Sequence, residues 1–221
     1  MYKRLIALVL VVAVAWLIHF RNNLLDKVAV MSGSGAPPPG FTDSAPELLE
    51  NTSDKVILWE TASKVVEGIK SNDDKPSPIT KYLRYNMRRF TNLPQAYIMK
   101  YMVEESAKKT FEYSYLDDLN FSEGDVVCGI YKVVQRSSEK IELSFLPLPN
   151  SKGPQIKGRL IISFKDVGDG KTKVSNGLVM WRNKDDNLTL PLERAVGRWL
   201  HELMTCWLVD SGSAYVIEQS V

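Results

Sequence analysis

His201 is the residue of this sequence whose type best suits proton transfer, because it is the one histidine outside the N-terminal apolar segment. An imidazole can act as a general acid or base near neutral pH. At helical spacing His201 shares a face with Arg194, Arg198 and Thr205, opposite a stripe that carries two tryptophans. The face has two interpretations: an acid–base group at the mouth of a ligand cavity, or a solvated polar surface.

Tyr131 and Asn176 are the other candidate catalytic residues, since a phenol or an amide can polarise a carbonyl group. Asn176 interrupts an apolar series formed by Val174, Leu178 and Met180. A buried amide at that position needs a hydrogen-bond partner, and a ligand could supply one. The alternative is a polar residue of an exposed strand.

Three carboxylates are possible partners of this chemistry. Glu202 follows His201 directly, but adjacent helical side chains point about 100° apart, which disfavours a dyad. Glu112 and Glu142 fall in strand-like segments, where one side can face inward. A carboxylate in an apolar cavity has a raised pKa and can exchange a proton. Exposure on the outer face of a sheet is the alternative.

Aromatic rings on strand patterns and on the last helix are candidates for the wall of a ligand pocket. Such rings stack on unsaturated ligands, and phenols add hydrogen bonds. Plain core packing is the alternative for each. The predicted ligand-binding set is Tyr113, Tyr115, Tyr131, Trp181, Trp199, Leu203 and Trp207.

Several classes of site and partner find no support in the sequence. A single histidine outside the apolar segment and two isolated cysteines, Cys128 and Cys206, indicate no metal site, and no cofactor is expected. Both cysteines are expected to be buried and to pack as small apolar residues. A disulfide between them would require a lumenal domain. The formal net charge is +2, without a basic block, which indicates no nucleic-acid partner.

The N-terminus is strongly apolar over residues 5–20, LIALVLVVAVAWLIHF. We expect a membrane anchor over residues 1–25, with the membrane engaged through residues 5–25 and a single-pass location in the endoplasmic reticulum. A cleaved signal peptide, with small residues at positions 13–15, is the alternative. In a lumenal domain three sequons could be glycosylated, at Asn51, Asn120 and Asn187.

The remaining chain divides into a linker over residues 26–52, which contains SGSGAPPPG, and a folded domain over residues 53–221. Periodicity predicts helices over 54–70 and 79–90, and a third that begins at Pro94. It then predicts strands over 109–115, 125–135, 141–145, 157–164 and 172–182, with a hairpin turn at Asp169 and Gly170. A long helix follows from Pro191.

Strands in one block with helices at the ends indicate an α+β fold, in which a long C-terminal helix crosses an antiparallel sheet and encloses an apolar cavity. The segment 121–131, the strand 157–164 and the helix 191–212 together resemble the START-like, helix-grip superfamily. That resemblance implies a deep cavity for lipids, sterols, polyketides or hormones. It also implies that cofactor-free cyclase, dehydratase or isomerase activity is possible on this fold.

The N-terminal segment adds a narrower resemblance, to membrane-anchored cyclases of fungal natural-product pathways, the norbornene-forming Diels–Alderase type among them. The leading hypothesis is a membrane-tethered, cofactor-free cyclase, isomerase or pericyclase acting on an apolar terpenoid or polyketide of secondary metabolism. The alternatives are a non-catalytic carrier or sensor of lipids or sterols, and an interaction module whose core has no void.

Overall fold

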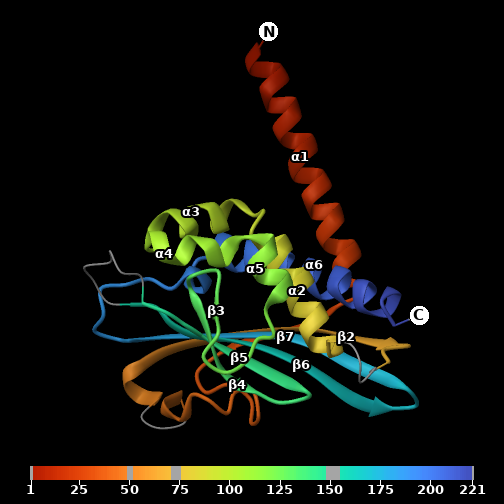
Figure 1. Cartoon of the computed structure of the whole chain (residues 1–221). Helices are drawn as coiled ribbons and strands as arrows, with labels where there is room; N and C mark the ends of the chain where they lie inside the picture. Colours follow the sequence, from red (N-terminus) through yellow and green to blue (C-terminus); the bar gives the residue numbers. More distant parts are fainter. Residues whose placement is uncertain (1, 49–51, 71–75, 148–154, 221) are drawn as a thin grey trace.

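The computed structural model describes residues 2–48, 52–70, 76–147 and 155–220. Its architecture is a seven-stranded antiparallel sheet with helices gathered on one face (Figure 1). The strands are β1 (Ala29–Ser34), β2 (Lys55–Glu67), β3 (Val126–Val127), β4 (Tyr131–Arg136), β5 (Lys140–Phe145), β6 (Lys157–Gly168) and β7 (Lys171–Asn183).

The α-helices are α1 (Tyr2–Leu25), α2 (Pro78–Phe90), α3 (Pro94–Met102), α4 (Glu105–Lys108), α5 (Tyr113–Asp118) and α6 (Ala195–Glu218). Four 3₁₀ turns complete the described elements: η1 (Pro46–Leu48), η2 (Thr52–Asp54), η3 (Lys109–Phe111) and η4 (Pro191–Glu193). Helix α6 packs across β2 and β7, and α2 packs beside it. The expected α+β class with a long C-terminal helix across an antiparallel sheet is therefore confirmed.

The strand order is β1-β2-β7-β6-β5-β4-β3. The β6–β7 hairpin turns at Gly168, Asp169 and Gly170, all with positive φ, as the Asp-Gly signal predicts. Strands β5, β6 and β7 and helices α2 and α3 all lie where periodicity places them. The terminal helix is also present, although Pro191 begins the turn η4 and α6 itself starts at Ala195.

The segment 54–70 is not a helix. Residues Lys55–Glu67 form β2, which pairs with β7 along its whole length. Both faces of β2 are covered: Ala62 packs beneath α6, and Ile57 packs against the segment that crosses the far side of the sheet. A strand buried on both faces lacks the alternation of polar and apolar residues that marks a half-exposed strand, so its apolar spacing can mimic a helix.

Two further predicted strands differ from the structure. Residues 109–115 form η3 and the start of α5, so Tyr113 and Tyr115 lie on a short helix. The segment 125–135 is broken into β3 and β4, because Cys128 and Gly129 have positive φ and turn the chain back on itself.

Strand β1 lies inside the range predicted to be a linker and forms the edge of the sheet beside β2. After β1 the chain does not turn directly into β2. It crosses the face of the sheet opposite α6, where Ala45 and Leu48 pack on Trp181 and Val179. The sheet thus has helices on one face and this crossing segment, residues 35–48, on the other. The domain boundaries at 25 and 52 remain predictions.

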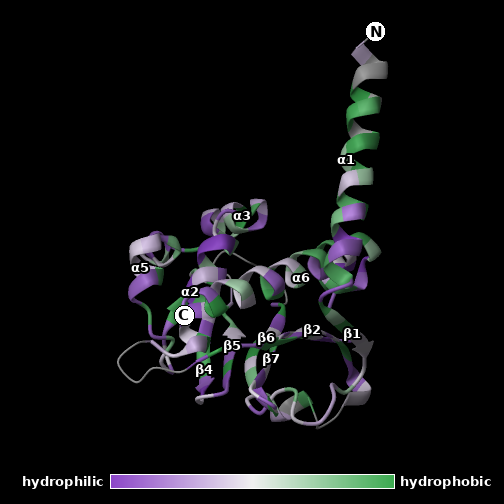
Figure 2. Ribbon diagram, turned by 90° about the vertical axis from the view of Figure 1, so that its right-hand side faces the viewer, coloured by the Kyte–Doolittle hydropathy of each residue, from purple (hydrophilic) through white to green (hydrophobic). Residues whose placement is uncertain are grey.

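Helix α1 extends away from the sheet (Figure 1), and Figure 2 shows hydrophobic residues along much of it. Its C-terminal end packs on α6 through Leu24, and apolar side chains nearer the N-terminus, such as Val11 and Trp16, are exposed. In the described part of the chain, no helix combines the length and apolar character required to cross a membrane. The expected anchor over residues 5–25 and the single-pass endoplasmic-reticulum location are therefore wrong.

Candidate functional site

A cavity of about 370 Å³ lies between α6 and the sheet, closed at one side by α2 and α3. Its wall is mainly apolar, and its residues come from α2, α3, β4, β5, β6, β7, η4 and α6. The apolar wall includes Leu83, Met87, Leu160, Leu178, Met180 and Met204. Polar groups in the wall come from Asn86, Gln95, Tyr131, Asn176, His201 and Thr205. Ligand pockets typically combine such an apolar lining with a few placed polar groups.

Alternate side chains of β7 form one wall of the cavity. Successive side chains of a strand point to opposite faces, so Asn176, Leu178 and Met180 line the cavity while Val179 and Trp181 pack on the crossing segment. The wall residues Pro191 and Leu200 are exposed, which places an opening beside the first turns of α6.

Gly197 permits the close approach of η4 to α6 at this opening. A Cβ atom at position 197 would lie 2.2 Å from the carbonyl oxygen of Pro191. Any other residue would push η4 outward, because a real Cβ contact does not come that close.

His201 lies in the cavity wall rather than on a solvated polar face. Its Nδ1 atom is 2.9 Å from Oε1 of Glu60 on β2, and the Thr205 hydroxyl is 3.4 Å from the same nitrogen. Glu60 is only 2% exposed. A carboxylate can only accept, so its contact orients Nδ1–H toward Glu60, and Nε2 is the ring nitrogen that this contact does not engage.

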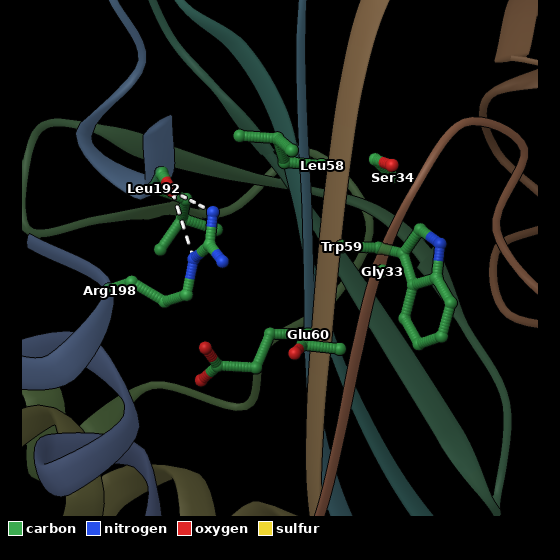
Figure 3. A pocket seen from close by; sticks show the side chains of 8 residues that line it. Gly33, Ser34, Leu58, Trp59, Glu60, Leu192 and Arg198 are labelled. Carbon is green, nitrogen blue, oxygen red and sulfur yellow. Dashed lines mark hydrogen bonds between the residues drawn. The ribbon is translucent and has the colours of Figure 1, made fainter. Parts of the chain in front are cut away.

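Glu60 also faces a second, smaller pocket of about 190 Å³ between β1, β2 and η4. In Figure 3 the Glu60 carboxylate and Arg198 lie on one side of β2 and the Trp59 ring lies on the other. Arg198 donates from Nε and Nη2 to the carbonyl oxygen of Leu192, at 3.2 and 3.1 Å. Leu192 lines both pockets, so the Glu60–His201 pair stands where they adjoin.

Asn176 lies in the cavity wall, and Oδ1 of its amide accepts a 2.8 Å hydrogen bond from the Tyr82 hydroxyl of α2. Tyr82 is fully buried, and burial raises the pKa of its phenol. The prediction that a buried amide at position 176 needs a partner is met here by a side chain of the protein.

Tyr131 also lines the cavity, between Phe90 and Phe145, with ring centroids 6.1 and 5.4 Å away. Burial raises the pKa of its phenol, so the group stays protonated and is suited to donating a hydrogen bond. Tyr131, Asn176 and His201 are therefore gathered in one cavity, and their catalytic roles remain predictions.

The rest of the predicted ligand-binding set lies elsewhere. Trp181 is buried on the opposite face of the sheet, and Leu203 and Trp207 pack toward the end of α1. Tyr115 donates to the carbonyl oxygen of Val126 at 2.8 Å. The residues of the set absent from the cavity wall are Tyr113, Tyr115, Trp181, Trp199, Leu203 and Trp207.

Glu60 and Asn86 are residues at or beside the site that the sequence patterns did not predict. A signal existed for each: Glu60 interrupts an apolar run, and Asn86 shares the buried face of a correctly predicted helix with Leu83 and Met87. What was missing was the register of β2 against β7, which sets Glu60 beside Leu178.

Glu142 is fully buried on the opposite face of the sheet from the cavity, where it holds the crossing segment. It accepts hydrogen bonds from the hydroxyls of Thr42 and Ser44, both at 2.5 Å, and from the backbone N–H of Asp43 at 2.8 Å. Burial works to raise the pKa of this carboxyl, but the hydrogen bonds outweigh it and the pKa is lowered. Glu142 is therefore a structural carboxylate.

Both cysteines are buried and free, as predicted. Burial raises the pKa of each thiol to about 12. Among the described residues no group of three or more histidine, cysteine or acidic side chains could hold a metal ion. Asn120 and Asn187 are exposed and Asn51 lies outside the described residues, and the use of these sequons remains a prediction.

Comparison with known proteins adds little to these observations. No family model matches the chain, and no curated protein matches it. Among solved structures the chain is similar to CalU16 from Micromonospora echinospora, with 10% identity and a TM-score of 0.33, over 87% of this chain and 92% of that one.

Proposed function

We propose that this protein binds a small apolar molecule in the cavity beneath α6 and converts it by acid–base chemistry at His201. The observation that carries the proposal is the position of His201 in the wall of a mainly apolar cavity, with its Nδ1 atom held by the buried Glu60. A cavity that only stores a lipid has no need of an oriented imidazole. The cavity volume of about 370 Å³ lies within the usual range for small-molecule sites.

The chemistry that suits this arrangement is a proton transfer that starts or ends a cyclisation or isomerisation. Nε2 of His201 would exchange a proton with the substrate, and Glu60 would stabilise the imidazolium that forms. Tyr131 would donate a hydrogen bond to a substrate oxygen. The apolar wall would hold a folded conformer and exclude water, and no cofactor is required.

Terpenoid and polyketide precursors of secondary metabolism are the substrates we propose first, including polyenes that cyclise by a Diels–Alder reaction. Their hydrocarbon bodies match the wall formed by Leu83, Leu160 and Met180. A carrier or sensor of lipids or sterols is the second candidate, favoured by the predominance of such apolar residues.

The experiment is to incubate the full chain with a panel of polyene terpenoids and polyketides and to follow products by mass spectrometry. His201→Gln should lower kcat by about 10²-fold or more, while ligand binding measured by native mass spectrometry is retained. His19→Gln, at an exposed position in α1, is the matched control and should turn over normally. Binding without turnover across the panel would favour the carrier, and absence of binding would contradict both functions.

A further inference from the structure

The side-chain amide of Asn176 has one bound end and one free end in the cavity wall. Its Oδ1 atom accepts the 2.8 Å hydrogen bond from the Tyr82 hydroxyl. Its Nδ2 group has no hydrogen-bond partner among the described residues, and it is not fully enclosed, in contrast to the amide atoms of Asn86. Asn176 as a whole is only 5% exposed. A donor in a largely buried, mainly apolar wall is costly to leave unpaired, and a ligand can supply the partner.

A chain of hydrogen bonds from α2 fixes which way this amide points. Asn86, one turn along α2 from Tyr82, is hydrogen-bonded to the Tyr82 hydroxyl. Burial raises the pKa of Tyr82, so the phenol keeps its one hydrogen and donates it to Oδ1 of Asn176. Asn86 is therefore the donor in its own bond to Tyr82. With Oδ1 held in this way, the Nδ2 group is the free end of the Asn176 amide.

Tight packing keeps Tyr82 and Asn86 in place. A Cβ atom at Gly212 of α6 would lie 2.6 Å from Cε2 of Tyr82 and 2.8 Å from both polar atoms of Asn86. The Tyr82 ring also meets Phe164 edge-on, with ring centroids 5.3 Å apart. These contacts leave the two side chains of α2 little room to move, so Asn176 is oriented before a ligand enters. Such preorganisation lowers the free-energy cost of binding.

We propose that Nδ2 of Asn176 donates a hydrogen bond to a carbonyl oxygen at the inner end of the ligand. The inference rests on the proposed function, since it needs a ligand in the same cavity, and it defines the class of that ligand. Nδ2 only donates and Oδ1 is occupied, so a hydroxyl would find no acceptor in this amide for its own hydrogen. The lining residues include no lysine, arginine, aspartate or glutamate, so a charged head group would find no fixed countercharge. A ketone or an ester is the class that fits.

The position of Asn176 along β7 sets how the ligand lies. Leu178 follows it toward the opening, where Leu192 packs on Leu178. The carbonyl oxygen would therefore lie at the closed end, and the hydrocarbon body would extend past Leu178. The register places Glu60 beside Leu178, two residues from Asn176 and hence about 7 Å along the strand. His201, which Glu60 holds, would then act on the body of the ligand rather than on its carbonyl oxygen.

Tyr131, the other candidate donor to a ligand oxygen, is too far from Asn176 to bind the same atom. It lies on β4, and the strands β5 and β6 separate β4 from β7. Three strand spacings amount to about 14 Å. An oxygen held by Asn176 is therefore distinct from one held by Tyr131, and a probe with a single oxygen can tell the two donors apart.

The test follows 2-nonanone, labelled with ¹³C at its carbonyl, bound to the full chain. In the wild type its carbonyl stretch should lie at a lower infrared frequency than in heptane, because a hydrogen bond weakens the C=O bond. In the double variant Tyr82→Phe/Asn176→Leu the band should return to the heptane frequency. The ratio of its Kd to that of 1-nonene, which lacks the oxygen, should rise about tenfold by titration calorimetry. The double variant removes both partners of the Tyr82–Asn176 hydrogen bond, so it leaves no orphaned hydroxyl.

Tyr85→Phe is the matched control, because Tyr85 lies on α2 outside the cavity wall, and it should change neither the band nor the Kd ratio. A wild-type band at the heptane frequency would overturn the inference without any variant. A band that moves in Tyr131→Phe and not in the double variant would also overturn it, because the oxygen would then belong to Tyr131. In both cases binding of the probes leaves the proposed function standing. If the wild type binds neither probe, the proposed function and the inference fail together.

Discussion

The Nδ1 atom of His201 lies 2.9 Å from Oε1 of Glu60, although the two residues are 141 positions apart in the sequence. The contact joins α6 to β2, the strand that α6 covers. Glu60 is almost completely buried, and His201 has a side-chain exposure of 20%. The pair therefore joins α6 to the sheet beside the cavity.

Loss of either partner should destabilise the fold. His201→Gln leaves the Glu60 carboxylate buried without its partner, and we expect it to lower the free energy of unfolding by about 2 kcal/mol. Glu60→Gln should have a similar effect. Urea denaturation of the two single variants and the double variant measures the coupling, which should reach about 1–2 kcal/mol. Strictly additive effects would show that the two side chains do not interact.

Glu142 should make stability depend on pH in the acid range. Its pKa is lowered in the folded protein, so the carboxylate contributes stability above its ordinary pKa of about 4.3, and that contribution is lost as the pH falls through the lower folded value. Glu142→Gln should be less stable than the wild type at pH 7, and the difference should shrink below about pH 4.

Thermal unfolding between pH 3 and pH 7, a range chosen to span the ordinary carboxyl pKa of about 4.3, tests this dependence. Glu139→Gln is the control, because Glu139 lies nearby in the β4–β5 hairpin but is exposed. A difference between wild type and Glu142→Gln that stays constant with pH would contradict the prediction.

Gly212→Ala should destabilise the protein even though alanine favours helices by about 1 kcal/mol over glycine. A Cβ atom there would lie 2.6 Å from Cε2 of Tyr82 and 2.8 Å from the Asn86 amide. We expect the overpacking of α2 against α6 to cost about 1–3 kcal/mol. Chemical denaturation measures the change, with Ser211→Ala on the same helix as a control. A stabilised Gly212→Ala variant would contradict this close packing.

The thiols of Cys128 and Cys206 should be unreactive in the folded state. Burial raises the pKa of each to about 12, which leaves little thiolate at pH 8, and access is blocked as well. Alkylation by iodoacetamide, followed by intact mass, should be at least about tenfold slower in buffer than in urea. Rapid labelling of the native protein would show that one of these sites opens.

The fold class, the strands β5, β6 and β7 and the helix α2 could be predicted, because these elements carry regular periodicity. Strand β2 could not, because the crossing segment and α6 bury both of its faces. The orientation of α6 on the sheet could not be predicted, for a related reason. The side of α6 that carries Trp207 packs toward Leu24 of α1, so another side of the helix, which carries His201, faces the cavity. A helix with two buried sides has no single apolar stripe from which its inner face can be read.

The hydrogen bonds from residues 42–44 to Glu142 also have a consequence for the order of folding. The backbone N–H of Asp43 and the Thr42 hydroxyl can bind this carboxylate only after β5 has joined the sheet. Residues near position 43 leave the ribosome about 100 positions before Glu142. Their hydrogen bonds to its carboxylate therefore cannot form until Glu142 has been synthesised. We expect the amides of Asp43 and Ser44 to gain protection from hydrogen exchange among the last in a refolding experiment. Residues 42–44 are then made early and bound in place only when β5 is present.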